Sequence, residues 1–488
     1  MTVRLTRLLK RDLDVDPEIT GVTADSRKVR PGFLFAALPG TRVDGAAFAA
    51  QAVAAGAAAV IAEQDLNLAV PTVVCRDPRR GYALAAAGFW GLQPQTCVAV
   101  TGTNGKTSVA NYCRQIFAGA GLIAASMGTL GLTVSRPDGT VDQLTPAGLT
   151  TPDAGDVAEL LARVAQLGVT HFAMEASSHG IDQRRLDAVR LTAAGFLNLT
   201  QDHLDYHGTM DAYLGAKLRL FEQLMPRGAT AVLNADSEAF PLFAAASVVS
   251  GQRVMSVGAG GQALKLLERT ASPEGQALKV RADGRLFDVR LPLAGDFQAS
   301  NALVAAGLCR AAGLSWEDVF AGLERLQGAP GRLQRVGAGP RGGEAYVDYA
   351  HTPDGLETVL KALRPHVRRR LIVVFGAGGD RDRSKRPLMG AVAARFADVA
   401  IITDDNPRSE PPAVIRAEVL AGARAVNGGV REIGDRREAI RSATSDLGDG
   451  DVLVVAGKGH EQGQIIGDAV HPFDDVLETA KALELVHG

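Results

Sequence analysis

The stretch TGTNGKTS, residues 101–108, has the residue types of a loop that binds phosphate. It follows a short apolar run, Cys97 to Val100, and precedes a helix-like pattern. Glycines let successive backbone N–H groups converge on an anion, Lys106 adds a positive charge, and the Thr107 hydroxyl can reach Mg²⁺. The general pattern G-x-x-x-x-G-K-S/T lacks its first glycine because Val100 stands in that place. We predict nucleotide binding, with an anion-binding turn or a chance match as alternatives.

Two further segments carry metal-binding residue types after apolar runs. The run 171–175 ends at Glu175, where a carboxylate could meet Mg²⁺, although an isolated glutamate there is more often solvated or a helix cap. The segment after Leu199 crowds four such side chains into six positions: Asp202, His203, Asp205 and His207. The crowding is compatible with metal or phosphate contact and also with ordinary loop hydrogen bonding.

Basic side chains near these segments could serve an acidic ligand. Gln183, Arg184 and Arg185 offer hydrogen-bond donors, with a solvated helix face as the alternative. Lys217 lies in a helical stretch beside Leu218, where a lysine usually extends its amine to solvent. Its position in the series of motifs favours a special role instead.

Two loops in the last third of the chain follow apolar runs. The loop 375–387, FGAGGDRDRSKRP, fails the dinucleotide pattern G-x-G-x-x-G because Arg381 occupies the place of the last glycine. A nicotinamide oxidoreductase is therefore improbable. The loop 403–412, TDDNPRSEPP, could be no more than an Asx–Pro turn.

The elements that must position these residues alternate between β-branched runs and Ala/Leu-rich helical stretches. This alternation predicts an α/β fold with parallel sheets, which bind ligands beyond the carboxyl ends of their strands. Gly/Pro-rich seams at 91–96 and 327–343 predict three domains. They are a small α/β domain at 1–92, a central P-loop-type domain with a parallel sheet at 93–332 and a Rossmann-like domain at 333–488.

Composition narrows the class of protein. The chain has 488 residues, 46% of them hydrophobic, and a formal net charge of −2, which argues against a surface built for nucleic acid or anionic membrane. The four cysteines are far apart, which fits a reducing cytoplasm and disfavours disulfides or structural zinc. The N-terminus has no continuous apolar region typical of a signal peptide, and the Ala-rich segment 45–63 is better interpreted as a helix followed by a strand than as a membrane span.

Several motifs occur in one order along nearly the whole chain: TGTNGKTS, EASSHG, DHLDYHG with a downstream AK, GDFQASNALVA, PGRLQRV, VDYAHTPD and DNPR. Together they resemble the Mur ligases, ATP-dependent enzymes that extend the peptide of peptidoglycan precursors. The resemblance implies an amide ligase that adds meso-2,6-diaminopimelate to the D-Glu of UDP-N-acetylmuramoyl-L-alanyl-D-glutamate. The reaction would pass through an acyl phosphate and release ADP and phosphate.

The same resemblance implies a role for each motif residue. The catalytic residues would be Lys106, Glu175, His203 and Lys217. Lys217 would be carried as a carbamate (N6-carboxylysine), which turns a cation into an anion beside the metal. Two Mg²⁺ ions would be held by Thr107, Glu175, His203 and Lys217. ATP would contact Gly102, Thr103, Asn104, Gly105, Lys106, Thr107, Ser108, Asn301, Arg332 and Asp348.

Two substrate sites are implied in the same way. The UDP-N-acetylmuramoyl-dipeptide would contact Ala24, Ser26, Thr41, Arg42, Val43, Thr150, Thr151, Ser177, Gln183 and Arg185. One family contact is missing because Asp44-Gly45-Ala46 replaces the DGH of many relatives. Diaminopimelate would contact Arg381, Asp405, Asn406, Pro407, Arg408, Gly457 and Glu461. DNPR marks the diaminopimelate type, and a guanidinium recognises a carboxylate through two hydrogen bonds.

Alternatives remain on the same motifs. The ligase could use L-lysine or L-ornithine, or the chain could be a folate polyglutamate-type ligase, although Thr107-Ser108 and DNPR differ from that family. A nucleotide-gated binding module without turnover is a further class, against which the complete set of motif residues argues. We expect a cytoplasmic monomer that binds its three substrates and neither nucleic acid nor a membrane.

Overall fold

Strands and helices alternate along most of the chain, as the sequence predicts. The computed structural model describes residues 2–40, 44–272, 274–426 and 430–485. Among the helices of these ranges, none combines the length and the apolar character that a bilayer span requires. The chain forms two compact units, unit 1 with residues 1–262 and 304–319, and unit 2 with residues 263–303 and 320–488. Both units contain parallel sheets, so the predicted α/β class is confirmed.

The first part of unit 1 carries a parallel sheet of short strands in the order β3-β4-β5-β6. Helix α3 begins at Pro78, whose ring fits the first helical position, and Asp77 caps it by accepting a backbone hydrogen bond. Leu34 and Ile61 of the sheet are buried with Phe89 of α3 in one core. The elements here are β1 (Val3–Arg4), α1 (Leu5–Leu9), β2 (Glu18–Ile19), β3 (Gly21–Thr23), η1 (Ser26–Lys28), β4 (Phe33–Ala36), η2 (Gly45–Phe48), α2 (Ala49–Ala54), β5 (Ala59–Ala62), β6 (Thr72–Val74) and α3 (Pro78–Trp90).

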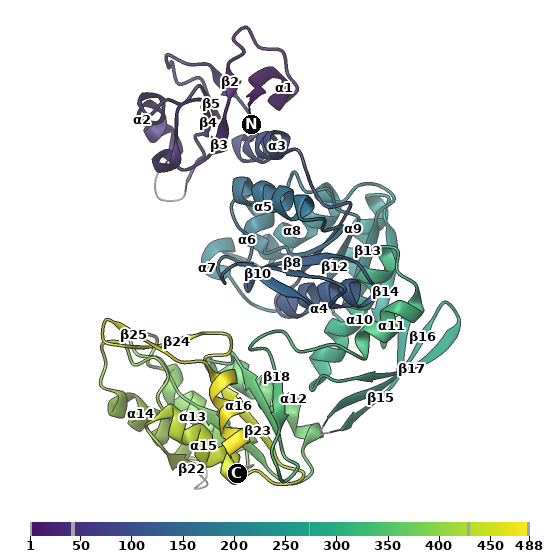
Figure 1. Cartoon of the computed structure of the whole chain (residues 1–488), viewed down its shortest axis with the longest axis vertical. Helices are drawn as coiled ribbons and strands as arrows, with labels where there is room; N and C mark the ends of the chain where they lie inside the picture. The colour runs from purple at the N-terminus through teal and green to yellow at the C-terminus, as the bar shows by residue number, and fades with distance from the viewer. Residues whose placement is uncertain (1, 41–43, 273, 427–429, 486–488) are drawn as a thin grey trace. The chain divides into compact units, whose positions relative to one another are not determined.

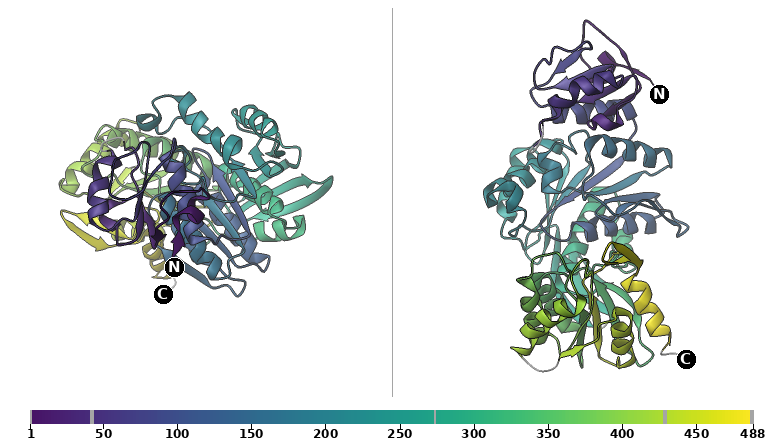
Figure 2. Two further views of the ribbon diagram at one scale, coloured as in Figure 1. Left: turned by 90° about the horizontal axis from the view of Figure 1, so that it is seen from above. Right: turned by 90° about the vertical axis from the view of Figure 1, so that its left-hand side faces the viewer.

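The rest of unit 1 is built on a larger sheet in the order β10-β9-β8-β11-β7-β12-β13-β14. Its strands are parallel from β8 to β14, and β9 and β10 add an antiparallel edge. Helix α5 lies on one face and α4 on the other (Figure 1, Figure 2). The elements are β7 (Thr96–Thr101), α4 (Lys106–Gly119), β8 (Ala124–Gly128), β9 (Gly131–Ser135), β10 (Val141–Thr145), α5 (Ala154–Gln166), β11 (His171–Glu175), α6 (Ser178–Asp182), β12 (Ala193–Phe196), α7 (Leu204–His207), α8 (Met210–Arg219), η3 (Leu220–Leu224), β13 (Thr230–Asn234), α9 (Phe240–Val249) and β14 (Arg253–Gly258).

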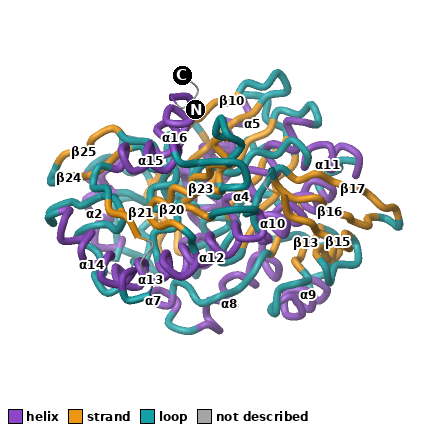
Figure 3. Tube along the Cα trace, turned by 90° about the horizontal axis from the view of Figure 1, so that it is seen from below, coloured by secondary structure: helices purple, strands orange, loops and turns teal. Residues whose placement is uncertain are grey.

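Unit 2 contains a sheet in the order β18-β19-β23-β20-β21-β22, parallel except for β18. Helices α15 and α16 cover one face, and α12, α13 and α14 cover the other (Figure 3). Three antiparallel strands, β15 (Leu264–Ser272), β16 (Gly275–Ala282) and β17 (Arg285–Leu291), precede this sheet within the described residues. Helices α10 (Asp296–Ala311) and α11 (Trp316–Leu323) are each divided between the two residue ranges, because residues 304–319 belong to unit 1. The other elements are β18 (Gln334–Ala338), β19 (Glu344–Asp348), α12 (Pro353–Leu363), η4 (Arg364–His366), β20 (Leu371–Phe375), α13 (Lys385–Phe396), β21 (Val399–Ile402), α14 (Pro412–Arg424), β22 (Val430–Glu432), α15 (Arg436–Ser445), β23 (Val452–Ala456), β24 (Gly463–Ile466), β25 (Ala469–Pro472) and α16 (Asp475–Leu485).

Candidate functional site

The loop 102–105 joins strand β7 to the N-terminus of helix α4, as the sequence predicts. Gly105 has a φ of +91°, which glycine adopts without strain, and a Cβ at Gly102 would lie 2.8 Å from the Cβ of Leu197. The Lys106 Nζ donates to the carbonyl oxygens of Gly102 and Thr103, each at 2.8 Å. The lysine therefore arches back over the loop, where a phosphate would also meet backbone N–H groups and the positive end of the helix dipole.

Glu175 and Thr107 are brought together beside this loop. The Thr107 Oγ1 donates to the Glu175 Oε2 at 3.0 Å, and the Thr129 N donates to the other oxygen at 2.8 Å. Glu175 is buried at the end of β11, and a Cβ on Gly128 would lie 2.0 Å from its Oε1. A hydroxyl beside a buried carboxylate suits Mg²⁺, which prefers oxygen ligands and keeps waters and phosphate oxygens in its shell.

Lys217 is buried on α8 rather than extended to solvent, with a relative exposure of 1%. Its Nζ donates to the Gly102 carbonyl at 2.8 Å and lies 4.3 Å from the centroid of the Tyr213 ring. Burial, and then the positive charge of Lys106, lower the pKa of Lys217 well below its ordinary value. The amine is therefore directed at the phosphate loop in an environment that favours its neutral form.

His203 stands at the edge of a cluster of aromatic and histidine rings after β12. Its ring centroid lies 4.8 Å from that of His179 and 6.2 Å from that of Tyr213, and its Nε2 is 3.4 Å from the Asp202 Oδ2. Burial, together with the neighbouring His203 and His207, lowers the pKa of His179. Within the described residues, no three side chains of His, Cys, Asp or Glu form a ready metal cluster.

The predicted dipeptide residues of α5, α6 and their loops lie in one hydrogen-bond network. The buried Thr151 Oγ1 accepts from the Ser177 Oγ at 2.9 Å and donates to the Glu175 carbonyl at 3.1 Å. The Arg185 Nη1 donates to the Thr151 carbonyl at 2.5 Å, the Arg185 Nη2 donates to the Gln183 Oε1 at 2.7 Å, and burial lowers the pKa of Arg185. Thr150 joins the network through the Thr129 Oγ1, at 3.0 Å.

A cavity of about 100 Å³ adjoins this network. Gln183 and Arg185 line it with residues absent from the sequence prediction: Leu38, Arg79, Tyr82, Leu149, Asp153 and Ala154. The Tyr82 hydroxyl donates to Asp153 at 2.6 Å, so a cap residue of α5 is tied to α3. Ala24 and Ser26 follow β3, and Thr41, Arg42 and Val43 lie outside the described residues.

In unit 2, the three predicted ATP residues share a hydrogen-bonded network. The Asn301 Nδ2 donates to the Gln298 Oε1 at 3.1 Å, and the Gln298 Nε2 donates to the Arg332 carbonyl at 3.2 Å. The buried Asp348 accepts the Leu333 N at 2.7 Å, and burial raises its pKa against these hydrogen bonds. The Arg332 guanidinium lies 5.0 Å from the Tyr349 ring centroid. Gln298 is the connecting residue that sequence reasoning missed.

A second cavity, of about 210 Å³, lies at the carboxyl ends of β20, β21 and β23. Six of the seven residues predicted to bind diaminopimelate line it: Arg381, Asp405, Asn406, Arg408, Gly457 and Glu461. Pro407 lies between lining residues without lining the cavity. The remaining lining residues, which the sequence prediction missed, are Tyr349, His351, Gly376, Gly378 and Lys385. The cavity thus offers cations and carboxylates together, which suits a zwitterionic ligand.

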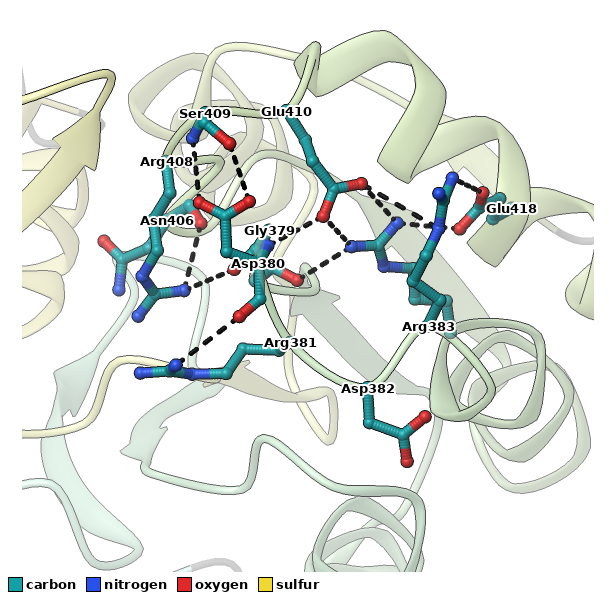
Figure 4. A network of polar contacts seen from close by, with 12 residues as sticks. Gly379, Asp380, Arg381, Asp382, Arg383, Asn406, Arg408, Ser409, Glu410 and Glu418 are labelled. Carbon is teal, nitrogen blue, oxygen red and sulfur yellow. Dashed lines mark hydrogen bonds and ion pairs between the residues drawn. The ribbon is translucent and has the colours of Figure 1, made fainter.

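Two loops hold the arginines of this cavity in place (Figure 4). The carboxylate of Asp380 accepts from the Ser409 N at 3.1 Å and the Ser409 Oγ at 2.7 Å. The Arg408 Nη1 donates to the Gly379 carbonyl at 2.8 Å, and the Asp380 N donates to the Glu410 Oε1 at 2.7 Å. Arg408 has a φ of +51°, an uncommon value that these contacts maintain.

Comparison with known proteins identifies relatives over nearly the whole chain. Three family models match: "Mur ligase family, catalytic domain" at residues 18–86, "Mur ligase middle domain" at 100–309, and "Mur ligase, glutamate ligase domain" at 331–459. The UDP-N-acetylmuramoyl-L-alanyl-D-glutamate--2,6-diaminopimelate ligase of Caulobacter vibrioides is 67% identical over 99% of both chains. The protein of the same name from Brucella melitensis is 53% identical over 96% of this chain and 94% of its own.

Comparison with solved structures also identifies relatives over most of the chain. A structure of a UDP-N-acetylmuramoyl-L-alanyl-D-glutamate--2,6-diaminopimelate ligase matches with a TM-score of 0.79, 34% identity and complete coverage of both chains. The folylpolyglutamate synthase of Mycobacterium tuberculosis, complexed with ADP, matches with a TM-score of 0.59 at 21% identity over 84% of this chain and 94% of its own. At this sequence identity, the second similarity shows a shared fold and nothing further.

Proposed function

The chain belongs to the Mur ligase family, and we propose that it joins 2,6-diaminopimelate to UDP-N-acetylmuramoyl-L-alanyl-D-glutamate at the expense of ATP. This is a step of peptidoglycan precursor synthesis. The 67% identity over 99% of both chains carries this conclusion. The mixed-charge cavity at the carboxyl ends of β20, β21 and β23 supports it independently, because diaminopimelate ends in an ammonium and a carboxylate on one carbon.

The reaction needs an activated carboxylate. A carboxylate oxygen of D-Glu attacks the γ-phosphorus of ATP, so that an acyl phosphate forms and ADP leaves. The incoming amine then attacks the acyl carbon and loses a proton, and inorganic phosphate departs with the bonding electrons of the C–O bond. All the phosphorus-bearing groups are anionic, so the protein contributes mainly positive charge and fixed dipoles.

Unit 1 supplies those groups. Lys106, the backbone N–H groups of the loop and the N-terminus of α4 would bind the phosphates. Thr107 and Glu175 would hold Mg²⁺, with His203 at a second ion, and the metal would neutralise charge on the phosphate oxygens when bound. Thr151, Ser177, Gln183 and Arg185 would orient the dipeptide.

The environment of Lys217 is the reason to propose its carbamylation. A buried ammonium beside Lys106 would repel Mg²⁺, whereas the neutral amine that burial favours is the form that attacks CO₂. The nitrogen bonds to the carbon of CO₂ and releases a proton, which leaves a carbamate anion. That anion would supply the oxygen ligand that a lysine lacks.

Arg408 and Arg381 would bind the distal carboxylate of meso-diaminopimelate, and Asp405 and Glu461 would bind its distal ammonium. L-Lysine carries the ammonium without the carboxylate, so the arginines would discriminate between the two. Gly378 leaves room beside Arg408, since a Cβ at Gly378 would lie 3.0 Å from the Arg408 Nη1. We further propose a monomer that works in the cytoplasm.

One assay tests the function. ADP release is measured with the UDP-muramyl dipeptide and, in turn, meso-diaminopimelate, L-lysine and L-ornithine. We expect turnover that requires both the dipeptide and meso-diaminopimelate, together with a product whose mass equals that of the tripeptide. ADP release without the dipeptide, or with glutamate and a folate acceptor instead, would contradict the proposal.

A further inference from the structure

Lys458 is a fully buried cation that lies outside both the phosphate loop and the lining of the amino-acid cavity. It follows β23 by two residues, and its relative exposure is 0%. Its Nζ donates to the Asn406 Oδ1 at 2.9 Å and lies 3.3 Å from the Glu461 Oε2. Burying an ammonium is costly unless it is paired, so its placement against two cavity residues calls for an explanation.

The contacts of Lys458 fix which way the Asn406 amide points. The Asn406 Oδ1 accepts from the Lys458 Nζ and also from the Ile465 N, at 3.0 Å. Both partners are donors, so the carbonyl end of the amide must face them. The Asn406 Nδ2 is thereby directed to the Glu461 Oε2, to which it donates at 2.9 Å.

Glu461 is then held from two directions by one of its oxygens. Lys458 and Asn406 both donate to the Oε2, and the Glu461 N donates to the Lys458 carbonyl at 3.0 Å. The charge of Lys458 also offsets one of the two carboxylates, Asp405 and Glu461, that line the cavity. These contacts hold the Glu461 carboxylate at the cavity wall, where it can receive a ligand ammonium.

Two glycines explain why the chain can deliver a lysine to this position. Gly457 and Gly459 have φ values of +121° and +56°. A Cβ at Gly457 would lie 2.5 Å from the Asp405 Oδ2, and one at Gly459 would lie 2.7 Å from the Tyr349 Cβ. The backbone thus turns tightly on both sides of Lys458, which lets its side chain enter the interior beneath the cavity.

We infer that Lys458 is a positioning residue for the ammonium end of the amino-acid substrate, acting through Asn406 and Glu461. This inference rests on the proposed function, because the substrate is taken to be a diamino acid. Lys458 acts behind the cavity wall, so its loss disturbs binding of the amino acid and leaves ATP and the dipeptide unaffected.

The test compares Lys458→Met with Lys458→Arg and with Lys481→Met in the full chain. Lys481 is a matched control, because its Nζ lies 3.4 Å from the Glu478 Oε1 with the same spacing of three residues, on the exposed side of α16.

Steady-state ADP release gives kcat and the KM of each of the three substrates. For Lys458→Met we expect the KM of meso-diaminopimelate to rise by at least about tenfold, with the other two KM values and kcat within about twofold of wild type. Lys458→Arg should recover most of this loss, and Lys481→Met should match wild type.

A double-mutant cycle with Asn406→Ala completes the test. If Lys458 acts through Asn406, the double variant should lose little more than Asn406→Ala alone. An unchanged KM for diaminopimelate in folded Lys458→Met would overturn the inference, as would equal rises in all three KM values. If Lys458→Met and Lys458→Gln both fail to fold while Lys458→Arg is fully active, Lys458 is a structural residue and the inference is also wrong. If the wild-type chain shows no turnover with diaminopimelate, the proposed function is wrong. The KM comparison is then made with the amino acid that the enzyme does use.

Discussion

The phosphate loop of unit 1 and the amino-acid cavity of unit 2 handle charge in opposite ways. Around the loop, the amines of Lys106 and Lys217 both donate to the carbonyl of Gly102, each at 2.8 Å, and the positive charge of Lys106 helps to lower the pKa of Lys217. Around the cavity, two buried cations are paired with carboxylates: Lys458 with Glu461, and Arg386 with Glu410. One region directs two lysine amines at the phosphate loop, and the other places cations and carboxylates side by side.

This difference indicates which kind of ligand each region binds. A loop lined by Lys106 and backbone N–H groups is completed by a triphosphate, whose negative charge grows on the transferred oxygens during reaction. A balanced cavity is already stable and selects a small zwitterion by the position of each charge. Removing a loop cation should therefore slow the chemical step, whereas removing a cavity charge should change which amino acid is used.

Among the variants that test this comparison, Lys106→Met should lose the most activity. We expect kcat to fall by about a thousandfold, because one preorganised charge on the phosphoryl oxygens is lost where water cannot replace it. ADP release at saturating substrates measures the loss, and Lys265→Met on the exposed face of β15 serves as the control. A variant that loses affinity for ATP but keeps its kcat would place Lys106 in ground-state binding only.

Lys217 gives the next largest effect, through CO₂. Wild-type enzyme assayed in CO₂-depleted buffer should lose activity by about a hundredfold, and added bicarbonate should restore it. Burial lowers the pKa of Lys217, so restoration should occur at a lower pH than an ordinary lysine would require. Lys217→Ala should be equally inactive with and without bicarbonate. Full wild-type activity without CO₂ would exclude a carbamate.

Arg408→Ala tests the cavity side. The kcat/KM for meso-diaminopimelate should fall by about a hundredfold, because the ligand carboxylate loses a charged partner, while that for L-lysine should change much less. Arg383→Ala is a matched control in the facing loop, since its guanidinium is exposed and pairs with Glu418 (Figure 4). Equal losses on both amino acids would show that Arg408 does not discriminate between them.

The sequence predicted these two regions unequally. The phosphate loop is local, since the strand, the glycines, Lys106 and Thr107 are consecutive, and the pattern therefore located it completely. The α/β class followed from periodicity and is confirmed, whereas the two boundaries between the three domains stay predictions. The burial of Lys217 could not be read from its own helix, because Tyr213 and the Gly102 carbonyl create that environment.

The cavity was predicted only in part, because tertiary packing assembles it from separate loops. The DNPR motif gave Arg408 and Asn406, but Lys385 and Tyr349 carry no signal beyond their positions after strands. Lys458 directly follows a predicted residue, and yet its sequence context does not reveal that it is buried. The balance of charge in this region is a property of the folded chain, which single motifs do not report.

Glu410 offers the smallest and most specific test of that balance. A hydrogen bond from the Arg386 guanidinium is the main reason that the pKa of Glu410 is lowered from 4.5 to about 2. A depressed carboxyl pKa stabilises the fold fully above pH 4.5, and this contribution is lost as the pH falls from 4.5 through about 2. The Glu410→Gln variant should therefore show a shallower decline of unfolding free energy between those two pH values than wild type.

Urea unfolding at pH 7, 4.5, 3 and 2 measures this slope, with Glu159→Gln on the exposed face of α5 as the control. Glu410 also accepts the Asp380 N, so the variant should raise the KM of diaminopimelate slightly, by about two- to threefold, and leave kcat unchanged. Because Arg386 still keeps Glu418, the loops should remain folded at pH 7. An identical pH slope in the variant would mean that the Arg386–Glu410 pair does not contribute to stability, and the contrast between a balanced cavity and an unbalanced loop would then rest on Lys458 alone.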